Sequence, residues 1–486
     1  MLGLRRPSVR IKDDHMLGKG FARNLITLLG GTAAGQIIAM LASPVLTRLY
    51  GASDFAVASA FVGISTILAI VATLRFDLAL LLPKSDEEAG GVLQLAALSI
   101  LVVTGLVTVG LWLSGPFLIA HVPTFTAVSP VLRWVPIMVL AVSCFQLCNA
   151  WANRARAYRP MAIAGVANQG GNVGLAMGLG GLHVHGPGMV IGRLFGQVMG
   201  ALWLLVSLRP TFPKAFATRD AMKAAAWRFR QFPLFNVPYS LLGAFSQEFL
   251  VFALLAYHQA ATAGAFALVR TVLLMPSRYL SQSLGLVFFR EAAQLFGTPA
   301  LETLTLKLMR RLSVAVIPLT VFSAFWSEEI FVLVFGPQWR EAGRMAAIYA
   351  PVGFLFLFTS WPERLYEVSE RQHISLSIEV FGNVLKVAAA VAPLQAGWGP
   401  LAAIIGYAIA DAAYHLVYLV GLFYVGRFRY VLLLSLLRDV CLHGATATIV
   451  CALFLKLPLA PYAQALGALA VVFAHTAYGI MWARRR

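Results

Sequence analysis

The chain contains little charge for its length. Only 12% of its 486 residues are Asp, Glu, Lys or Arg, whereas 59% are hydrophobic. A soluble domain carries about 25% charged residues, so this composition excludes an ordinary globular protein. The net charge of +18 would suggest nucleic acid in a soluble protein. Here it is better explained by basic loops that meet anionic lipid at one membrane face, so we expect membrane lipids as partners and no nucleic acid.

Sequence signatures of common catalytic sites are also missing. The chain has no Gly-Lys-Ser/Thr nucleotide loop, no His-Glu-x-x-His pair and no nucleophile elbow, which argues against ATP hydrolysis and metal-dependent chemistry. The four cysteines, Cys144, Cys148, Cys441 and Cys451, all lie in apolar runs and none forms a Cys-x-x-Cys motif. We therefore predict no disulfide, no metal site, no cofactor and no enzymatic activity.

What the chain has instead is a series of long apolar stretches. About fourteen of them approach twenty residues, the length that crosses a bilayer. The predicted spans are 24–47, 54–82, 89–112, 131–151, 161–181, 189–208, 233–257, 263–288, 311–335, 343–368, 373–396, 399–425, 431–455 and 459–483. The sequence thus predicts an all-α integral membrane protein with both termini on the same side.

The basic residues predict which side that is. Lys and Arg concentrate in every second connection, among them the 1–23 tail, the Arg154/Arg156/Arg159 cluster and the 209–232 segment. The alternate connections hold only Arg48, Arg133, Arg340, Arg344 and Lys456. Cytoplasmic loops of membrane proteins are enriched in Lys and Arg, so we expect a multi-pass protein of the bacterial inner membrane with both termini in the cytoplasm.

The spans also predict an organisation into two lobes. A basic cytoplasmic tail (1–23) precedes a six-helix lobe (24–208), and a basic linker (209–232) with an amphipathic helix near 219–230 leads to a second six-helix lobe (233–425). Residues 426–486 add two further helices and a basic C-terminus. The similar openings at Leu49–Ala56 and Ala256–Ala263 suit two related lobes, as in many secondary transporters.

Charged residues inside the spans are candidates for function, because an ionisable side chain in hydrocarbon costs about 2.5–3.5 kcal/mol or more. Arg193, Arg270 and Lys386 lie deep in their spans. We expect them to face a water-filled central cleft; the alternative is buried ion pairs with Glu248, Glu379 or Asp411. Arg278 lies nearer the boundary, where it either lines the cleft or extends to the interface.

The acidic residues and one histidine form a second group of candidates. Asp411 and His415 are four residues apart and share a helix face, as do Glu379 and Lys386 at a spacing of seven. Because an imidazole titrates near physiological pH, Asp411 and His415 either relay protons or form a structural pair. We assign Glu248, Glu379, Asp411 and His415 as candidates for ion coupling.

Two sequence segments resemble a known family. The segment Ser43–Phe55 reads SPVLTRLYGASDF, and the segment Thr73–Ala89 reads TLRFDLALLLPKSDEEA. Both resemble the polysaccharide transporter family, the Wzx-type oligosaccharide flippases of the MOP superfamily. The resemblance implies a fold like that of MATE exporters and of the lipid II flippase. It also implies movement of an undecaprenyl-diphosphate-linked oligosaccharide from the cytoplasmic to the periplasmic leaflet for surface polysaccharide synthesis.

The resemblance further suggests how the cargo is held. Cavity arginines contact the diphosphate in the lipid II relative, and Arg48 and Arg270 occupy comparable helices here. Together with Arg193, Arg278 and Lys386 they are the substrate-binding candidates, since guanidinium and ammonium groups bind phosphate oxygens strongly. In this family, coupling to a proton or sodium gradient and contact with other polysaccharide-assembly proteins are further expectations.

Three alternatives are open at this stage. A MATE-like exporter of small molecules would place carboxylates deep in the cleft, whereas the excess of Arg and Lys here favours an anionic cargo. An O-antigen polymerase or ligase would need a long outer loop, and the longest outer connection is only 113–130. A scaffold for other biosynthetic proteins would use the basic loops as docking surfaces.

Overall fold

The computed structural model describes residues 34–212 and 218–485. The predicted tail (1–23), the first part of the first span and part of the linker lie outside these residues. The described residues contain no β-strand, and nearly all of them are helical, so the predicted all-α class is confirmed.

The helices follow one another with short connections. A first helix spans Ala34–Leu49. The next elements are α2 (Ala52–Thr73), α3 (Phe76–Ala79), α4 (Asp86–His121), α5 (Pro123–Val128), η1 (Leu132–Trp134), α6 (Val135–Arg154), α7 (Tyr158–Gly181), α8 (Pro187–Leu208), η2 (Arg209–Thr211) and α9 (Arg219–Arg228). The chain continues through η3 (Phe232–Asn236), α10 (Val237–Ala256), α11 (Ala260–Leu295), α12 (Pro299–Phe335), η4 (Pro337–Trp339), α13 (Arg340–Ser360), η5 (Pro362–Arg364), α14 (Leu365–Val368), α15 (Gln372–Gln395), α16 (Pro400–Gly426), α17 (Tyr430–Leu455) and α18 (Pro461–Arg485).

Helix boundaries follow from local backbone chemistry. Proline begins several helices, as at Pro187 and Pro400, where its missing N–H would have had no partner. The predicted 54–82 span is interrupted, because Leu74 and Arg75 adopt left-handed backbone angles and separate α2 from α3. The chain therefore turns within the motif that begins at Thr73.

Ten of the described helices are long and apolar enough to cross a membrane. The other four predicted spans coincide with the short apolar helix Ala34–Leu49 and with α7, α11 and α18. The total of fourteen spans therefore stays a prediction.

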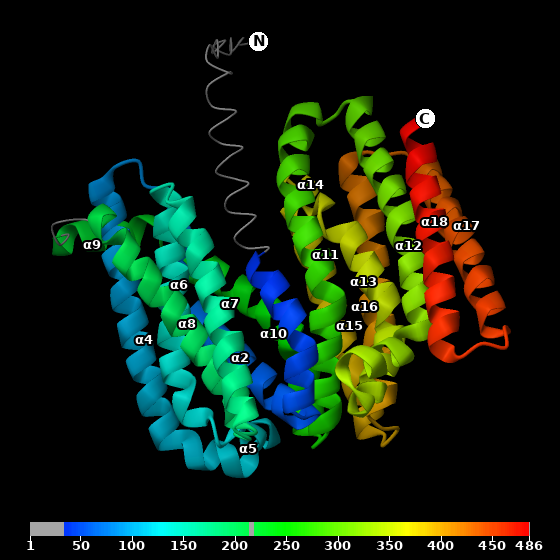
Figure 1. The fold of residues 1–486 in the computed structure, drawn as a ribbon. Coiled ribbons are helices and arrows are strands. Elements are labelled where there is room, and N and C mark those ends of the chain that lie inside the picture. Colours follow the sequence, from blue (N-terminus) through cyan, green and yellow to red (C-terminus); the bar gives the residue numbers. More distant parts are fainter. Residues whose placement is uncertain (1–33, 213–217, 486) are drawn as a thin grey trace, which may run out of the picture.

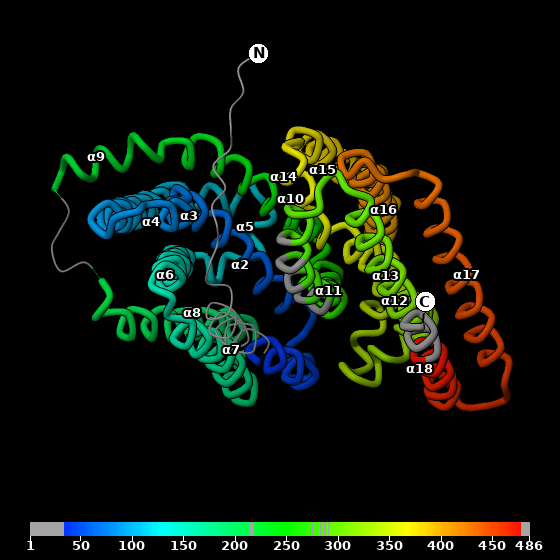
Figure 2. The backbone as a smooth tube through the Cα atoms, turned by 90° about the horizontal axis from the view of Figure 1, so that it is seen from above, coloured from blue at the N-terminus to red at the C-terminus, as the bar shows by residue number. Residues whose placement is uncertain are grey.

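Figure 1 shows two groups of helices. The first helix, α2, α4, α6, α7 and α8 form one group, with α9 lying across its upper end. Helices α10, α11, α12, α13, α15 and α16 form the other, and α17 and α18 pack on its outer side against α12. Figure 2 shows the same two groups from above. We call the end that carries α9 the α9 end and the opposite end, which carries η4, the Trp339 end.

The two groups are joined at the Trp339 end. The indole Nε1 of Trp339 and the side-chain Nε2 of Gln338 both donate hydrogen bonds to the carbonyl oxygen of Thr47, each at 2.9 Å. The ring of Phe55 lies edge-on to Trp339, with centroids 4.9 Å apart. The connection between α12 and α13 is therefore docked on the end of the first helix.

A close helix crossing strengthens this junction. A Cβ atom on Gly264 of α11 would lie 1.6 Å from the carbonyl oxygen of Ala52 in α2. Only glycine allows two helix backbones to approach so closely. One hydrophobic core runs through both groups here, with members such as Phe61 of α2 and Phe266 of α11. Toward the α9 end the ribbons of the two groups diverge (Figure 1).

Within the first group, α7 and α8 pack by the same principle. A Cβ atom on Gly196 would lie 2.2 Å from the carbonyl oxygen of Asn168, and one on Gly192 would lie 2.7 Å from that of Asn172. The side chain of Asn168 also donates to Gln197 at 2.7 Å. Small residues thus permit the contact and an amide pair stabilises it.

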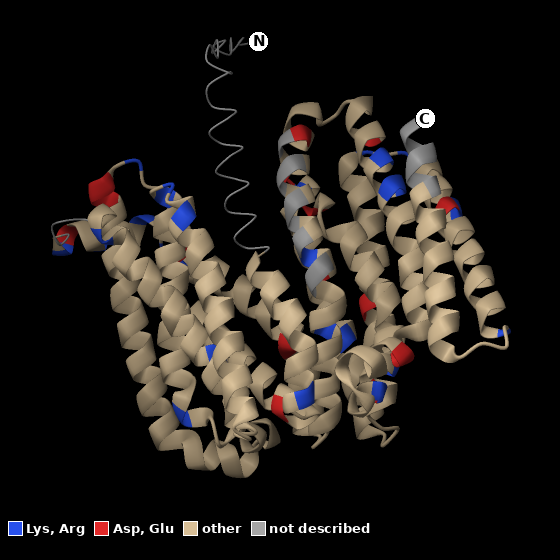
Figure 3. Ribbon diagram, viewed as in Figure 1, with Lys and Arg blue, Asp and Glu red and all other residues tan. Residues whose placement is uncertain are grey.

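The charges are distributed unevenly along the helices. Figure 3 shows many Lys and Arg residues gathered at the α9 end. At this end Arg154 pairs with Asp86 at 3.0 Å, and Arg230 stacks on the exposed ring of Trp227, 3.8 Å from its centroid. Stacked Arg and Trp side chains suit a membrane–water interface.

Candidate functional site

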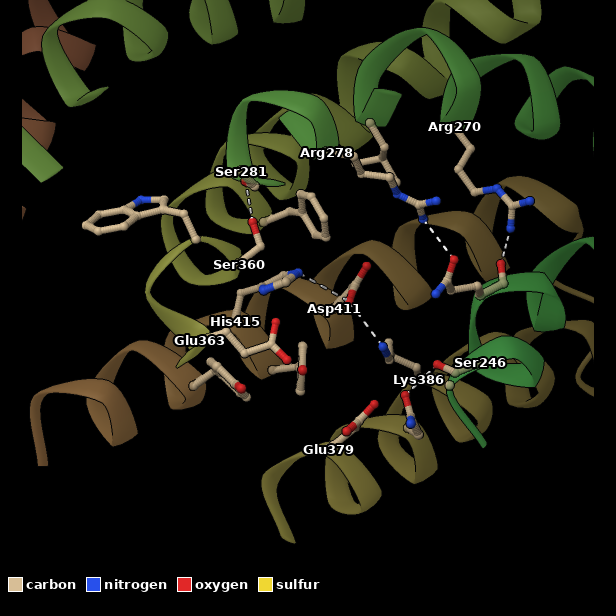
Figure 4. Close-up of a pocket in the computed structure, with 18 of the residues that line it drawn as sticks. Ser246, Arg270, Arg278, Ser281, Ser360, Glu363, Glu379, Lys386, Asp411 and His415 are labelled. Atoms are coloured by element: carbon tan, nitrogen blue, oxygen red, sulfur yellow. Dashed lines mark hydrogen bonds and ion pairs between the residues drawn. The ribbon is translucent and has the colours of Figure 1, made fainter. Parts of the chain in front are cut away.

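A polar cavity of about 720 Å³ lies inside the second group of helices. It is lined by residues of α10, α11, α13, η5, α15 and α16, and Figure 4 shows many of their side chains pointing toward one another. Its charged and imidazole side chains are those of Arg270, Arg278, Glu363, Arg364, Glu379, Lys386, Asp411 and His415. Most of them come from the middle of membrane-length helices, where hydrocarbon would otherwise surround them.

One side of the cavity carries an arginine pair from α11. The guanidinium of Arg270 makes two hydrogen bonds to the carboxylate of Glu248, at 2.7 and 2.8 Å, and a third to the carbonyl oxygen of Gln247. Arg278, two turns along the same helix face, donates to Oε1 of Gln247 at 3.0 Å. Gln247 of α10 therefore orients both guanidinium groups, that of Arg270 through its carbonyl oxygen and that of Arg278 through its side chain.

The opposite side carries a buried ion pair between α15 and α16. The ammonium of Lys386 lies 3.4 Å from Oδ1 of Asp411, and both residues are less than 9% exposed. Oδ2 of Asp411 accepts a 2.6 Å hydrogen bond from the hydroxyl of Tyr349. The ammonium also lies 4.7 Å from the centroid of the Tyr414 ring, a favourable cation–π contact.

His415 extends this cluster along α16. Its Nε2 lies 3.8 Å from Oδ1 of Asp411, and its Nδ1 lies 2.8 Å from the hydroxyl of Thr359. On α15, Asn383 accepts a 2.5 Å hydrogen bond from Ser246, while its buried Nδ2 has no partner within the described part of the chain. The cavity wall thus offers polar groups that a hydroxyl-rich ligand could satisfy.

The structure brings most of the predicted residues together. Arg270, Arg278 and Lys386 line one cavity with Glu379, Asp411 and His415, and Glu248 reaches it through its bond to Arg270. For the deep cations we weighed a position on a cleft against a buried ion pair. Arg270 and Lys386 show both features, since each lines the cavity and each belongs to an ion pair.

Two predicted residues lie elsewhere. Arg48 is exposed at the end of the first helix, where its Nη1 donates to the carbonyl oxygen of Pro44 at 3.4 Å. Arg193 is half-buried on α8. Neither lines this cavity. Among the described residues, its walls come from the second group, whereas we expected a central cleft. Their predicted contact with substrate stays a prediction.

The sequence reasoning missed the aromatic part of the site. Tyr407, Tyr414 and Tyr418 line the cavity beside Asp411. With Asp411 included, these residues follow one another along α16 at spacings of four, three and four, which places all of them on one helix face. This pattern could have been found in the sequence. Tyr349 of α13 has no such signal, because its partner Asp411 is 62 residues away.

The fold and the cavity define a class of protein. A multi-pass helical bundle in two groups, with a charged cavity at membrane depth, is the architecture of a membrane transporter. The model of a family described as "Polysaccharide biosynthesis protein" matches residues 45–344. The chain belongs to this family.

Solved structures share the fold. The chain is similar to the lipid II flippase MurJ in an inward closed conformation, with a TM-score of 0.70, 12% identity, and coverage of 93% of this chain and 98% of that one. It is also similar to an inward-facing MATE family multidrug resistance transporter, with a TM-score of 0.60, 15% identity, and coverage of 81% and 94%.

A third structure with this fold is a MOP superfamily transporter from Pyrococcus furiosus, with a TM-score of 0.52 and 15% identity over 83% of this chain and 95% of that one. No curated protein matches the chain.

Proposed function

We propose that the protein carries a polyprenyl-diphosphate-linked oligosaccharide across the bacterial inner membrane, for the synthesis of a surface polysaccharide. The observation that carries the proposal is the set of three cations, Arg270, Arg278 and Lys386, in the wall of one cavity at membrane depth. A diphosphate cannot cross hydrocarbon unaided, and charge-assisted hydrogen bonds from guanidinium and ammonium groups would stabilise it there.

The geometry supports binding by exchange of partners. Nη2 of Arg270 donates to both carboxylate oxygens of Glu248, and phosphate oxygens are anionic acceptors that a guanidinium also binds through charge-assisted hydrogen bonds. In the empty cavity the carboxylate neutralises the cation, and an entering diphosphate takes its place. The cation is therefore available without being left unpaired in the empty state, which would be costly.

Alternating access supplies the movement. The two groups contact each other at the Trp339 end through Thr47, Trp339 and the Gly264 crossing, and they diverge toward the α9 end (Figure 1). The basic residues favour the cytoplasm at the α9 end. In our proposal this conformation receives cargo from the cytoplasmic leaflet, and separation of the groups at the Trp339 end releases it to the other leaflet, without a catalytic step.

The charge balance of the cavity also favours a second candidate function, the export of small organic cations. Among the residues that the structure describes, four cationic side chains line it together with three carboxylates, those of Glu363, Glu379 and Asp411, and Glu248 lies next to them. A MATE-like exporter of organic cations would use such carboxylates directly. Binding of a phosphorylated rather than a cationic probe separates the two functions.

The cellular test is deletion of the gene followed by analysis of lipid-linked intermediates. We expect polyprenyl-diphosphate-linked oligosaccharides to accumulate on the cytoplasmic leaflet, where an impermeant glycosidase added to intact spheroplasts cannot reach them. Wild-type export of glycan with no trapped intermediate, in a strain without a related gene, would reject the proposal. A cavity variant that accumulates normally and restores export would instead indicate a scaffold.

A further inference from the structure

The ammonium of Lys386 is held loosely for a buried cation. An ammonium has three N–H donors, and the contacts of Lys386 are a 3.4 Å approach to Oδ1 of Asp411 and the face of the Tyr414 ring. The residue lines the cavity, and its four-carbon side chain is flexible. Lys386 can therefore turn toward a ligand without a change in the helices.

Asp411 is held more firmly on one side than on the other. Its Oδ2 accepts the 2.6 Å hydrogen bond from Tyr349, whereas the contacts of Oδ1 among the described residues are the Lys386 ammonium at 3.4 Å and Nε2 of His415 at 3.8 Å. The charged and titratable groups around Asp411 and its neighbouring tyrosines are Lys386 and Glu379 from α15, Tyr349 from α13, Arg270 from α11, Glu248 and Tyr239 from α10, Glu363 from η5, and Tyr407, Tyr414 and His415 from α16.

The hydrogen bonds of Thr359 are linked to the tautomer of His415. The hydroxyl of Thr359 has one hydrogen and three possible acceptors, the carbonyl oxygens of Leu355 at 3.1 Å and Phe356 at 3.4 Å and Nδ1 of His415 at 2.8 Å. When the hydroxyl donates to a carbonyl of the preceding turn, Nδ1–H of the imidazole donates to the hydroxyl oxygen. In that tautomer Nε2 carries a lone pair, and this lone pair faces Oδ1 of Asp411.

In that tautomer two acceptor atoms face each other across 3.8 Å. Without a cation nearby, a carboxylate in this position would be buried and unpaired, at a cost that drives carboxylates to bind a proton. A proton on Oδ1 would have an acceptor ready in Nε2 of His415. The pair Asp411–His415 thus provides a proton-binding position that is needed only when Lys386 leaves.

We propose that Lys386 has two alternative partners, the carboxylate of Asp411 in the empty cavity and a phosphate oxygen of the bound cargo, and that a proton replaces it on Asp411. The inference rests on the proposed function. One ion pair breaks, another forms, and one proton passes from the aqueous phase to Oδ1 of Asp411. Loading of the diphosphate and uptake of this proton are then linked one to one, and release of the cargo reverses both.

The test is isothermal titration of the purified full-length protein in nanodiscs with farnesyl diphosphate as the probe. The binding enthalpy is measured at one pH in buffers of different ionisation enthalpy, which reports the protons taken up per ligand. We expect Asp411→Asn to bind the probe but to take up one proton fewer than the wild type. We expect Lys386→Met to weaken binding by about ten- to hundredfold, as for loss of one charge-assisted hydrogen bond.

Glu379→Gln is the matched control, because it changes another lining carboxylate to an amide on the helix of Lys386. It should retain the full proton uptake. Three results would overturn the exchange and leave the proposed function standing. They are equal proton uptake by Asp411→Asn and the wild type, loss of the proton in Glu379→Gln instead, and tight binding by the wild type with no proton uptake. Failure of the wild type to bind the diphosphate would overturn both.

Discussion

Gly264 offers a sharp test of how the two helix groups are held together. A methyl group at this position would lie 1.6 Å from the carbonyl oxygen of Ala52, and real Cβ atoms essentially never approach within 3.0 Å. The Gly264→Ala variant must therefore separate α2 and α11 by about 1.4 Å. The methyl group cannot avoid the contact by rotation, because the backbone of α11 fixes the position of its carbon and the oxygen belongs to the backbone of α2.

The expected cost follows from packing. Inserting a methyl group into a closely packed contact costs about 1–3 kcal/mol, whereas replacing glycine by alanine within a helix is otherwise favourable by about 1 kcal/mol. Gly174→Ala is the matched control, since nothing lies within 4 Å of a Cβ atom at that position of α7. The favourable term applies at both positions and cancels, so Gly264→Ala should have a free energy of unfolding about 1–3 kcal/mol lower than that of Gly174→Ala.

Unfolding in mixed micelles of detergent and SDS, followed by tryptophan fluorescence, measures this difference. Gly264→Ala should unfold at a lower SDS fraction than the wild type, and Gly174→Ala at the same or a higher fraction. If Gly264→Ala were as stable as Gly174→Ala, then α2 and α11 would not cross in direct backbone contact, and the closed Trp339 end would need another explanation.

Three further predictions concern single contacts. Arg270→Ala should abolish glycan export and destabilise the fold by about 3–5 kcal/mol, because it leaves Glu248 unpaired. Adding Glu248→Ala should restore the stability but not the export, as measured in a complementation assay. Full export by either variant would contradict the role of the Arg270 cation. Trp339→Phe keeps an aromatic ring but loses the bond to Thr47, so the free energy of unfolding should fall by about 1 kcal/mol, and no change would show that the bond is dispensable. Gly196→Ala should destabilise the α7–α8 pair in the same SDS assay, and wild-type stability there would refute the close crossing.

The local features of this protein could be predicted from the sequence alone. Apolar stretches place the helices to within a few residues in most cases, as for α8 and α16, because backbone groups in hydrocarbon must be hydrogen-bonded within a helix. Several boundaries were predicted less well, those of α2, α4, α11, α12 and α13. Helix α12 begins at Pro299 rather than near 311, and α4 continues to His121, since helices extend beyond the apolar segment that a hydropathy pattern detects.

Only the tertiary structure decided which charges meet. Glu248 and Arg270 are 22 residues apart in sequence, and Lys386 and Asp411 come from different helices; pairing them requires the rotation of each helix about its own axis. A membrane helix that is apolar on nearly all sides gives little information about that rotation. Close crossings such as the one at Gly264 set this rotation through steric fit between partners. For this reason Arg193 could be identified from the sequence as a cation deep in its span but not placed relative to the cavity.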